Sequence, residues 1–170
     1  MNVIFNNTTI KIINYFSKDI PTRTTIMSVQ KQPQRHPYTW EFLKRFSLTN
    51  PPKITLYRDV ETDDNYGILR TQLKENRIST TDYLKAKLFG GPHKFKEYRF
   101  IKNEFGYNVE HNILHYNLWL NPTVDLELDN KKIKLFLDKI LVNKNYIVFK
   151  NLPQNMSVPG IIHYHIFFKT

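Results

Sequence analysis

The 170-residue sequence contains no cysteine, which excludes disulfide bonds and thiolate metal sites. No apolar run reaches about 18 residues, and the start of the chain lacks the compact apolar core of a secretory signal. Phosphate-binding glycine loops of the G-x-x-x-x-G-K-[ST] or G-x-G-x-x-G kind are also missing. We therefore expect an intracellular protein, cytoplasmic rather than mitochondrial, with no membrane partner, no cofactor and no P-loop or dinucleotide-fold chemistry.

Basic residues predominate over acidic ones. Lys and Arg number 25 against 15 Asp and Glu, giving a formal net charge of +10. Such a surface attracts anionic partners, namely nucleotides, phosphorylated metabolites or nucleic acids. The many Asn, Ile, Lys and Tyr residues are equally what an A/T-rich genome encodes, so the charge by itself identifies no site. It also says nothing of the oligomeric state.

Composition divides the chain into two parts. Residues 1–36 are rich in Asn, Thr, Lys and Gln, and Asp19 is their only acidic residue. We expect this segment to be a flexible or loosely docked arm. A mitochondrial transit peptide is the alternative, although Arg is sparse near the start. Residues 37–170 are expected to form a single domain.

Periodicity within that domain predicts helices first and strands afterwards. Three helices are expected, beginning after Thr39, after Asp63 or Asp64, and after Thr80 or Thr81. Strands are expected over 97–101, 112–120, 146–149 and 161–168, with a helix capped by Asp129 that turns Ile133, Phe136, Leu137, Ile140 and Leu141 inward. This order predicts an α+β fold in which N-terminal helices pack on a mainly antiparallel sheet covered on one face.

Two histidines lie two residues apart near the end of the chain, His163 and His165 in the run Ile-His-Tyr-His-Ile. Side chains alternate along a strand, so both imidazoles and Phe167 are expected on one face. Burying two imidazoles without partners would cost free energy, which favours ligand binding or catalysis over a structural role. The spacing also suits a metal site completed by His111 or His115 and a carboxylate.

Polar residues at other predicted strand ends could form a cleft around these histidines. Asn103 follows one strand, His115 lies on the next, and Lys150 and Asn151 follow the third. Lys150 would supply a hydrogen-bond donor for phosphate oxygens. The alternative for both asparagines is that they close turns by bonding their own backbone.

A basic stretch interleaved with aromatic residues covers residues 83–102. Such a pattern could stack bases and pair phosphates, as a nucleic-acid surface does. The alternation favours aromatic residues in the core and cations in solvent. In that case cations such as Arg99 and Lys102 are available to border a phosphate pocket.

Several motifs in fixed order resemble the fungal N-acetylglucosamine-induced protein family, an uncharacterised domain. They are Asn-Glu-Phe-Gly-Tyr (103–107), His-Tyr-Asn-Leu-Trp (115–119), Val-Phe-Lys-Asn (148–151) and His-Tyr-His-Ile (163–166). The family pattern is close to Asn-Asp-Trp-Pro-Tyr, His-x-x-x-Trp, Lys-Asn and a final His-x-His. One departure is Gly106, where the family usually has Pro; it loosens that turn without removing Asn103.

The layout also resembles, more distantly, the histidine-triad superfamily of nucleotide hydrolases and transferases. In the His-x-His-x-His strand of those proteins, His163 matches the first position and His165 the second, whereas Phe167 stands at the third. The resemblance implies that His165 attacks an α-phosphorus, with Asn151 and Ser157 in the loop that approaches the phosphate. Because Phe can neither donate a proton nor orient the nucleophile, the resemblance leaves turnover open.

We therefore expect a histidine-triad-like protein that binds a nucleotide or nucleotide-sugar phosphate, with activity as a nucleotide phosphohydrolase or nucleotidyltransferase left open. The alternatives are a non-catalytic basic module that binds RNA or another polyanion, and a His-based metal-dependent enzyme. The candidate catalytic residues are His165, His163 and His115, and the candidate ligand-binding residues are Asn103, Asn151, Ser157, Lys150, Arg99 and Lys102.

Overall fold

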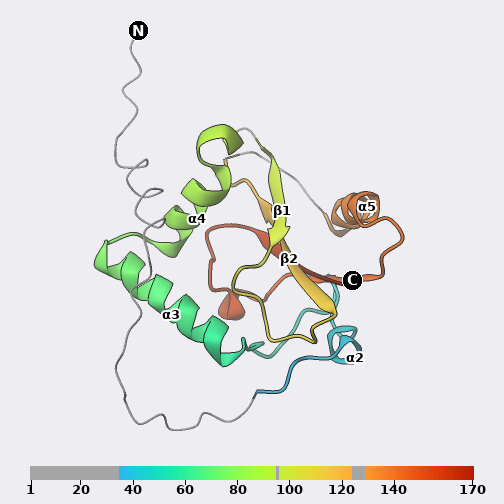
Figure 1. Ribbon diagram of the computed structural model, residues 1–170. Coiled ribbons are helices and arrows are strands. Elements are labelled where there is room, and N and C mark those ends of the chain that lie inside the picture. Colours follow the sequence, from blue (N-terminus) through green and yellow to red (C-terminus); the bar gives the residue numbers. More distant parts are fainter. Residues whose placement is uncertain (1–34, 95, 124–128) are drawn as a thin grey trace. The chain divides into compact units, whose positions relative to one another are not determined.

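Three helices precede the sheet in the computed structural model, which describes residues 35–94, 96–123 and 129–170. They are α2 (Trp40–Leu43), α3 (Val60–Glu75) and α4 (Thr80–Phe89) (Figure 1). Each follows a residue whose side-chain oxygen accepts a hydrogen bond from a backbone N–H three positions on, respectively Thr39, Asp59 and Ser79. These caps satisfy N–H groups that have no partner within the first helical turn.

The start of α3 differs from the prediction. The helix begins at Val60, earlier than the expected Asp63 or Asp64. Asp59 accepts hydrogen bonds from both the N–H of Thr62, at 2.8 Å, and its hydroxyl, at 2.7 Å. Two bonds from one residue make Asp59 the stronger cap, and they also lower the pKa of its carboxyl group.

Four strands form one antiparallel sheet in the order β1-β2-β4-β3. They are β1 (Tyr98–Lys102), β2 (Ile113–Leu120), β3 (Tyr146–Phe149) and β4 (His163–Lys169). The predicted α+β class and antiparallel sheet are confirmed. Strands β2 and β4 lie at the centre, where both of their faces can be buried.

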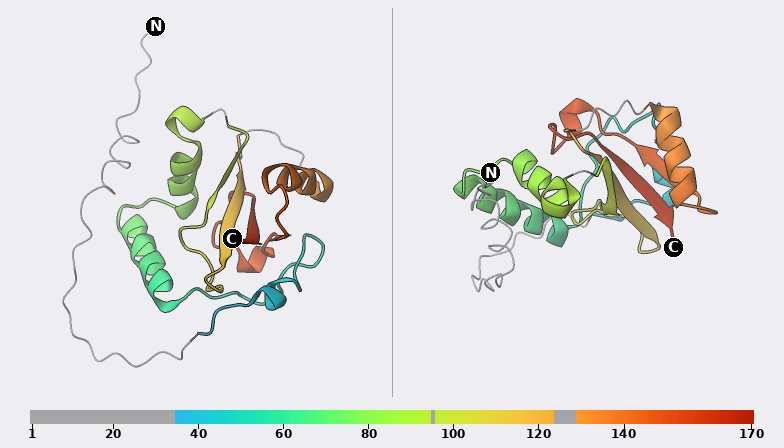
Figure 2. Two further views of the ribbon diagram at one scale, coloured as in Figure 1. Left: turned by 45° about the vertical axis from the view of Figure 1, so that its right-hand side comes forward. Right: turned by 90° about the horizontal axis from the view of Figure 1, so that it is seen from above.

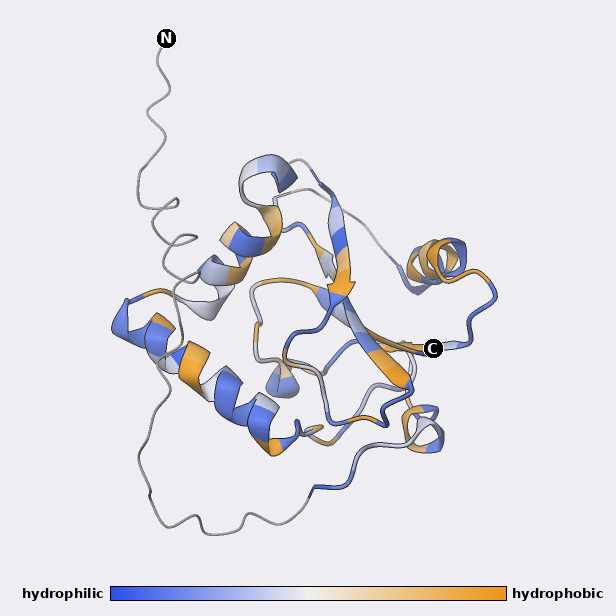
Figure 3. Ribbon diagram, in the orientation of Figure 1, coloured by the Kyte–Doolittle hydropathy of each residue, from blue (hydrophilic) through white to orange (hydrophobic). Residues whose placement is uncertain are grey.

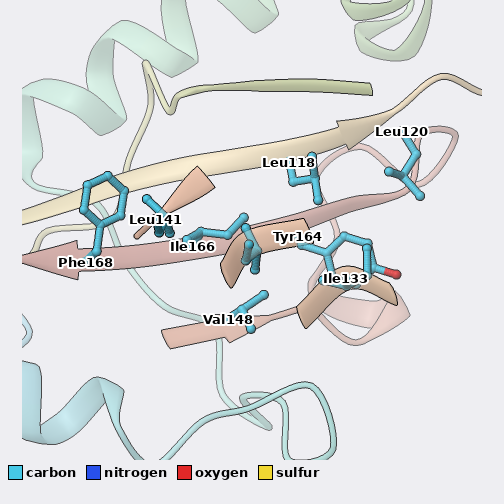
Figure 4. Packing of buried hydrophobic residues seen from close by; sticks show 9 residues of the cluster. Leu118, Leu120, Ile133, Leu141, Val148, Tyr164, Ile166 and Phe168 are labelled. Atoms are coloured by element: carbon cyan, nitrogen blue, oxygen red, sulfur yellow. The ribbon is translucent and has the colours of Figure 1, made fainter. Parts of the chain in front are cut away.

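Both faces of the sheet are covered, with α3 and α4 on one side and α5 (Asn130–Ile140) on the other (Figure 2). The expectation of cover on one face was wrong, because β4 is buried on both faces. Hydrophilic residues predominate along α3, whereas β2 carries both hydrophobic and hydrophilic residues (Figure 3). Figure 4 shows the core on the α5 side, formed by Leu118, Leu120, Ile133, Leu137, Leu141, Val148, Tyr164, Ile166 and Phe168.

Helix α5 begins as predicted, at the Asp129 cap, whose carboxylate accepts the N–H of Lys132 at 2.7 Å. Ile133 and Leu137 are fully buried, as expected from the helical period. Ile140 is 41% exposed, so its predicted inward orientation was wrong. It is the last residue of the helix, where the sheet no longer covers that side.

The opposite face carries two further groups of buried residues. Leu43 of α2 packs with Phe149 and Phe167 of the sheet. Leu88 and Phe89 of α4 pack with Trp119, Val158 and Ile161. Between them the helices and the sheet enclose the site described below.

The predicted arm at 1–36 lies outside the described residues, apart from its last two. The carbonyl oxygens of these two accept hydrogen bonds from the domain: Arg35 from Asn108 Nδ2 and His36 from the Tyr57 hydroxyl, each at 2.8 Å. Among the residues that the structure describes, no helix has the length and apolar character needed to cross a membrane.

Candidate functional site

Strand β4 places His163, His165 and Phe167 on one face of the sheet, as the alternation predicted. The antiparallel register with β2 sets Trp119 opposite His163 and Asn117 opposite His165. Directly opposed residues share a face and lie within contact distance. We call this side of the sheet the histidine face.

A pocket lies between the histidine face and helices α3 and α4. Its volume is about 750 Å³, which includes the part open to solvent. The buried His163 and Trp119 line it from the sheet, while the half-buried Tyr66 and the exposed Lys87 line it from the helices.

His163 lines this pocket, and one of its two ring nitrogens is hydrogen-bonded within the protein. Its Nδ1 lies 2.8 Å from the carbonyl oxygen of Ile161, which can only accept, so Nδ1 carries the proton. Nε2 then holds a lone pair, and among the described residues no hydrogen bond to Nε2 is found. Burial lowers the pKa of His163, outweighing the opposite effect of the Ile161 carbonyl, and the charge of Lys150 lowers it further. The neutral ring stacks on Trp119, with centroids 4.4 Å apart.

His115 and His165 form a hydrogen-bonded pair on the same face. His115 Nε2 lies 3.0 Å from His165 Nδ1, and the backbone N–H of Tyr107 donates to His115 Nδ1 over 3.1 Å. Because that Nδ1 accepts, neutral His115 carries its proton on Nε2 and donates it to His165. His165 must then carry its own proton on Nε2.

Asn151 is the last member of this hydrogen-bond network. Its Nδ2 lies 3.1 Å from His165 Nε2 and 2.7 Å from the Tyr107 hydroxyl, which accepts from it. Donation from Nδ2 to His165 would require an unprotonated Nε2, against the order set by the Tyr107 N–H. A half-turn of the amide puts its oxygen there, accepting from both His165 Nε2–H and the Tyr107 hydroxyl. We assign that orientation, because it lets the Nε2–H of His165 and the Tyr107 hydroxyl both donate to Asn151.

Both ring nitrogens of His165, the expected nucleophile, are therefore bonded inside the protein. Burial lowers the pKa of His165 well below its ordinary value, and the neighbouring His115 adds to the effect. Burial, with a contribution from the charge of Arg58, lowers the pKa of His115 to about 3. His163 therefore differs from His165 and His115, because one of its ring nitrogens has no hydrogen bond among the described residues.

Two cations of the pocket were not singled out from the sequence. The Cζ of Arg58 lies 4.3 Å from the ring centroid of Tyr66, and its Nε donates to the Phe105 carbonyl over 3.0 Å. Lys87 forms a 2.6 Å ion pair with Glu104. Lys87 belongs to the basic stretch of the sequence, but Arg58 lies in a loop without any periodic pattern, so no sequence signal identifies it.

The other predicted ligand-binding residues fall in different places. Asn103, Lys102 and Ser157 line the pocket, whereas Lys150 acts on His163 only through its charge. Asn103 also closes a turn, since its Oδ1 accepts the N–H of Phe105 at 3.1 Å, the alternative considered for it above. Arg99 is not among the described lining residues, and its Nη1 donates to the carbonyl of Leu88 over 3.3 Å, tying β1 to α4.

A metal-binding arrangement finds no support in residues 35–94, 96–123 and 129–170, where no group of three or more His, Asp or Glu is suited to an ion. His115 and His165 use their nitrogens on each other, Tyr107 and Asn151. Of the three buried histidines, His163 is the one with a ring nitrogen free of hydrogen bonds among the described residues, and one imidazole does not hold a zinc or iron ion.

Comparison with known proteins places this site within a family. A family model described as "Protein of unknown function (DUF3605)" matches residues 39–169. The chain belongs to the DUF3605 family. The match spans all the site residues described above, so the pocket lies within the DUF3605 domain itself. Its fold is similar to the crystal structure of HTC1, with a TM-score of 0.53 and 18% identity over 78% of this chain and 85% of that chain. No curated protein matches this DUF3605 chain.

Proposed function

We propose that this DUF3605 domain binds a nucleotide or nucleotide-sugar phosphate in the pocket between α3, α4 and the histidine face. The observation that carries the proposal is His163, a neutral imidazole in the lining of the pocket, whose Nε2 has no hydrogen bond among the described residues. Its position in a His-x-His strand resembles the fungal N-acetylglucosamine-induced proteins and, more distantly, the histidine-triad proteins. The resemblance to the histidine-triad proteins supports a phosphorylated ligand.

The charges around the pocket favour an anion. Its described lining residues include the cations Arg58, Lys87 and Lys102 and one carboxylate, Glu104. A guanidinium held in place by Tyr66 is well suited to phosphate oxygens, because little side-chain entropy is lost on binding. The phosphate would therefore lie near His163 and these cations.

The remaining lining is mostly aromatic and aliphatic. Tyr66, Tyr83 and Phe105 border the pocket together with Trp119. Flat aromatic side chains stack on a base or a sugar ring with little dependence on its identity. A ligand with a phosphate at one end and a ring system at the other thus matches the pocket better than a bare anion does.

Turnover would use His163 as nucleophile. Nε2 would bond to the α-phosphorus as the bond to the leaving group breaks, and water would then cleave the phosphorus–nitrogen bond and restore the imidazole. The leaving group also needs a proton. Phe167, at the third position of the strand, is fully buried against His115, with ring centroids 4.2 Å apart, and supplies none. Binding is therefore the proposed function, and any hydrolysis or transfer is expected to be slow.

A thermal-shift panel of nucleotides, nucleotide sugars and sugar phosphates tests the proposal. A ligand at a hundredfold excess over its Kd raises the free energy of unfolding by about 2.7 kcal/mol, so a modest binder is visible. His163→Asn keeps an amide N–H for the Ile161 carbonyl and removes Nε2. We expect it to weaken the shift, as does Arg58→Gln.

Replacing His111, which is exposed and outside the pocket lining, provides the matched control. His111→Gln is expected to respond to the panel as the wild type does. The proposal is overturned if no phosphorylated compound raises the melting temperature of the wild type. It is equally overturned if His163→Asn and Arg58→Gln both keep the full shift.

A further inference from the structure

An ion pair crosses the pocket between helix α4 and the loop after β1. Lys87 Nζ lies 2.6 Å from Oε2 of Glu104, and both side chains line the pocket. Glu104 is the one acidic residue among the described lining residues. A carboxylate therefore stands where an anionic ligand would meet Lys87.

The Glu104 side chain can leave this position without moving its loop. The side chain is 58% exposed, and among the described residues its hydrogen-bond partner is Lys87. The main chain beside it is held twice, since the Phe105 N–H donates to Asn103 and the Phe105 carbonyl accepts from Arg58. Rotation of one exposed side chain is enough to exchange the carboxylate for a ligand.

We infer that, in the absence of ligand, the Glu104 carboxylate occupies the position beside Lys87 that the ligand's phosphate takes on binding. The pocket therefore selects phosphate groups with two or more negative charges, namely phosphomonoesters and pyrophosphates. The inference rests on the proposed function and specifies which phosphates it concerns.

The selectivity follows from an exchange of anions on Lys87. A singly charged phosphodiester or carboxylate would replace the Glu104 carboxylate by a group of the same charge, with little gain. A more highly charged phosphate attracts the cation more strongly and has oxygens left for a second cation of the pocket, such as Arg58. Only the second kind of ligand gains enough to open the ion pair.

Titration of the full ¹⁵N-labelled chain with pyrophosphate and with dimethyl phosphate, followed by NMR, tests the inference. The chain has two tryptophans, of which Trp119 lines the pocket and Trp40 does not, so their indole N–H signals provide a site probe and an internal reference. In the wild type we expect pyrophosphate to shift the Trp119 signal and dimethyl phosphate to shift neither.

Glu104→Gln removes the competing carboxylate. We expect its Kd for pyrophosphate to fall about fivefold, and dimethyl phosphate to begin shifting Trp119. Glu75→Gln makes the same change of charge at the exposed end of α3, away from the pocket, and is expected to behave as the wild type. Lys87→Met is expected to weaken pyrophosphate binding.

Equal gains in Glu104→Gln and Glu75→Gln would overturn the inference, because net charge would then explain them. So would equal binding of the two probes by the wild type. If nucleotides raise the melting temperature but Glu104→Gln shows no gain for pyrophosphate, the inference fails and the proposed function stands. If no probe shifts the Trp119 signal in any variant and no nucleotide raises the melting temperature, both the inference and the proposed function fail.

Discussion

His163 and His165 occupy one strand and one face, yet their neighbours give them different chemistry. The Ile161 carbonyl fixes the proton of His163 on Nδ1 and leaves Nε2 to the pocket. His165 is bonded on both nitrogens, by His115 and by Asn151. The spacing of the two histidines in the sequence therefore determines that two imidazoles share one face. Hydrogen-bond partners from other segments determine which ring nitrogen remains free.

Gly106 shows how tightly this network is packed. A Cβ atom at this position would lie 3.2 Å from Nδ1 of His115, the atom that accepts the Tyr107 N–H. We expect Gly106→Ala to push the His115 ring and to lower the free energy of unfolding by about 1–3 kcal/mol. Urea unfolding followed by tryptophan fluorescence measures the change.

Gly67→Ala is the matched control. A Cβ atom at Gly67, within α3, meets nothing within 4 Å. Alanine favours a helix over glycine by about 1 kcal/mol, so this variant is expected to be more stable than the wild type. The same substitution should thus act in opposite directions at the two sites. A stabilising Gly106→Ala would contradict the close contact with His115.

Among the elements, α5 depends most clearly on its helical period. Its Asp129 cap and its inward residues Ile133 and Leu137 were predicted and are confirmed, whereas Ile140 is exposed. Its inward face closes the core opposite the histidine face (Figure 4). That helix therefore stabilises β2 and β4 from the side away from the pocket.

Leu137→Ala tests this packing. Leu137 is fully buried in the core under α5, so its truncation is expected to cost about 2–5 kcal/mol of unfolding free energy. Leu135, on the same helix, is 53% exposed, and Leu135→Ala is expected to change stability by less than about 0.5 kcal/mol. Equilibrium denaturation of both variants gives the comparison, and similar losses would argue against the observed orientation of α5.

The stability of the whole molecule is expected to depend on pH through the three buried histidines. Burial lowers the pKa of each in the folded state, to about 3 for His115. Below about pH 6.5 the unfolded chain therefore binds more protons than the native one. The free energy of unfolding must then fall as the pH drops from about 6.5 toward 3, by up to about 1.4 kcal/mol per pH unit for each group. Urea unfolding over this range measures the slope.

Variants identify the source of that slope. His163→Asn removes one of the buried groups, so its stability is expected to fall less steeply on acidification. His111→Gln replaces an exposed histidine and should keep the wild-type slope. Equal slopes in all three proteins would show that other groups cause the acid sensitivity.

At the scale of the molecule, the pocket joins segments that are distant in sequence. Arg58 comes from the loop before α3, Lys87 from α4 and His163 from the last strand. The motifs on the strands were predictable because alternation in a strand has a fixed period. Arg58 was not, since its position depends on stacking with Tyr66 and on the carbonyl of Phe105.

The sequence by itself determined the α+β class, the helical face of α5 and the shared face of His163, His165 and Phe167, because each follows from a local period or cap. Only the tertiary structure decided that both faces of the sheet are covered, that Arg58 and Lys87 border the pocket, and that His165 is bonded on both nitrogens. These features depend on contacts between residues far apart in the chain, which no local pattern encodes.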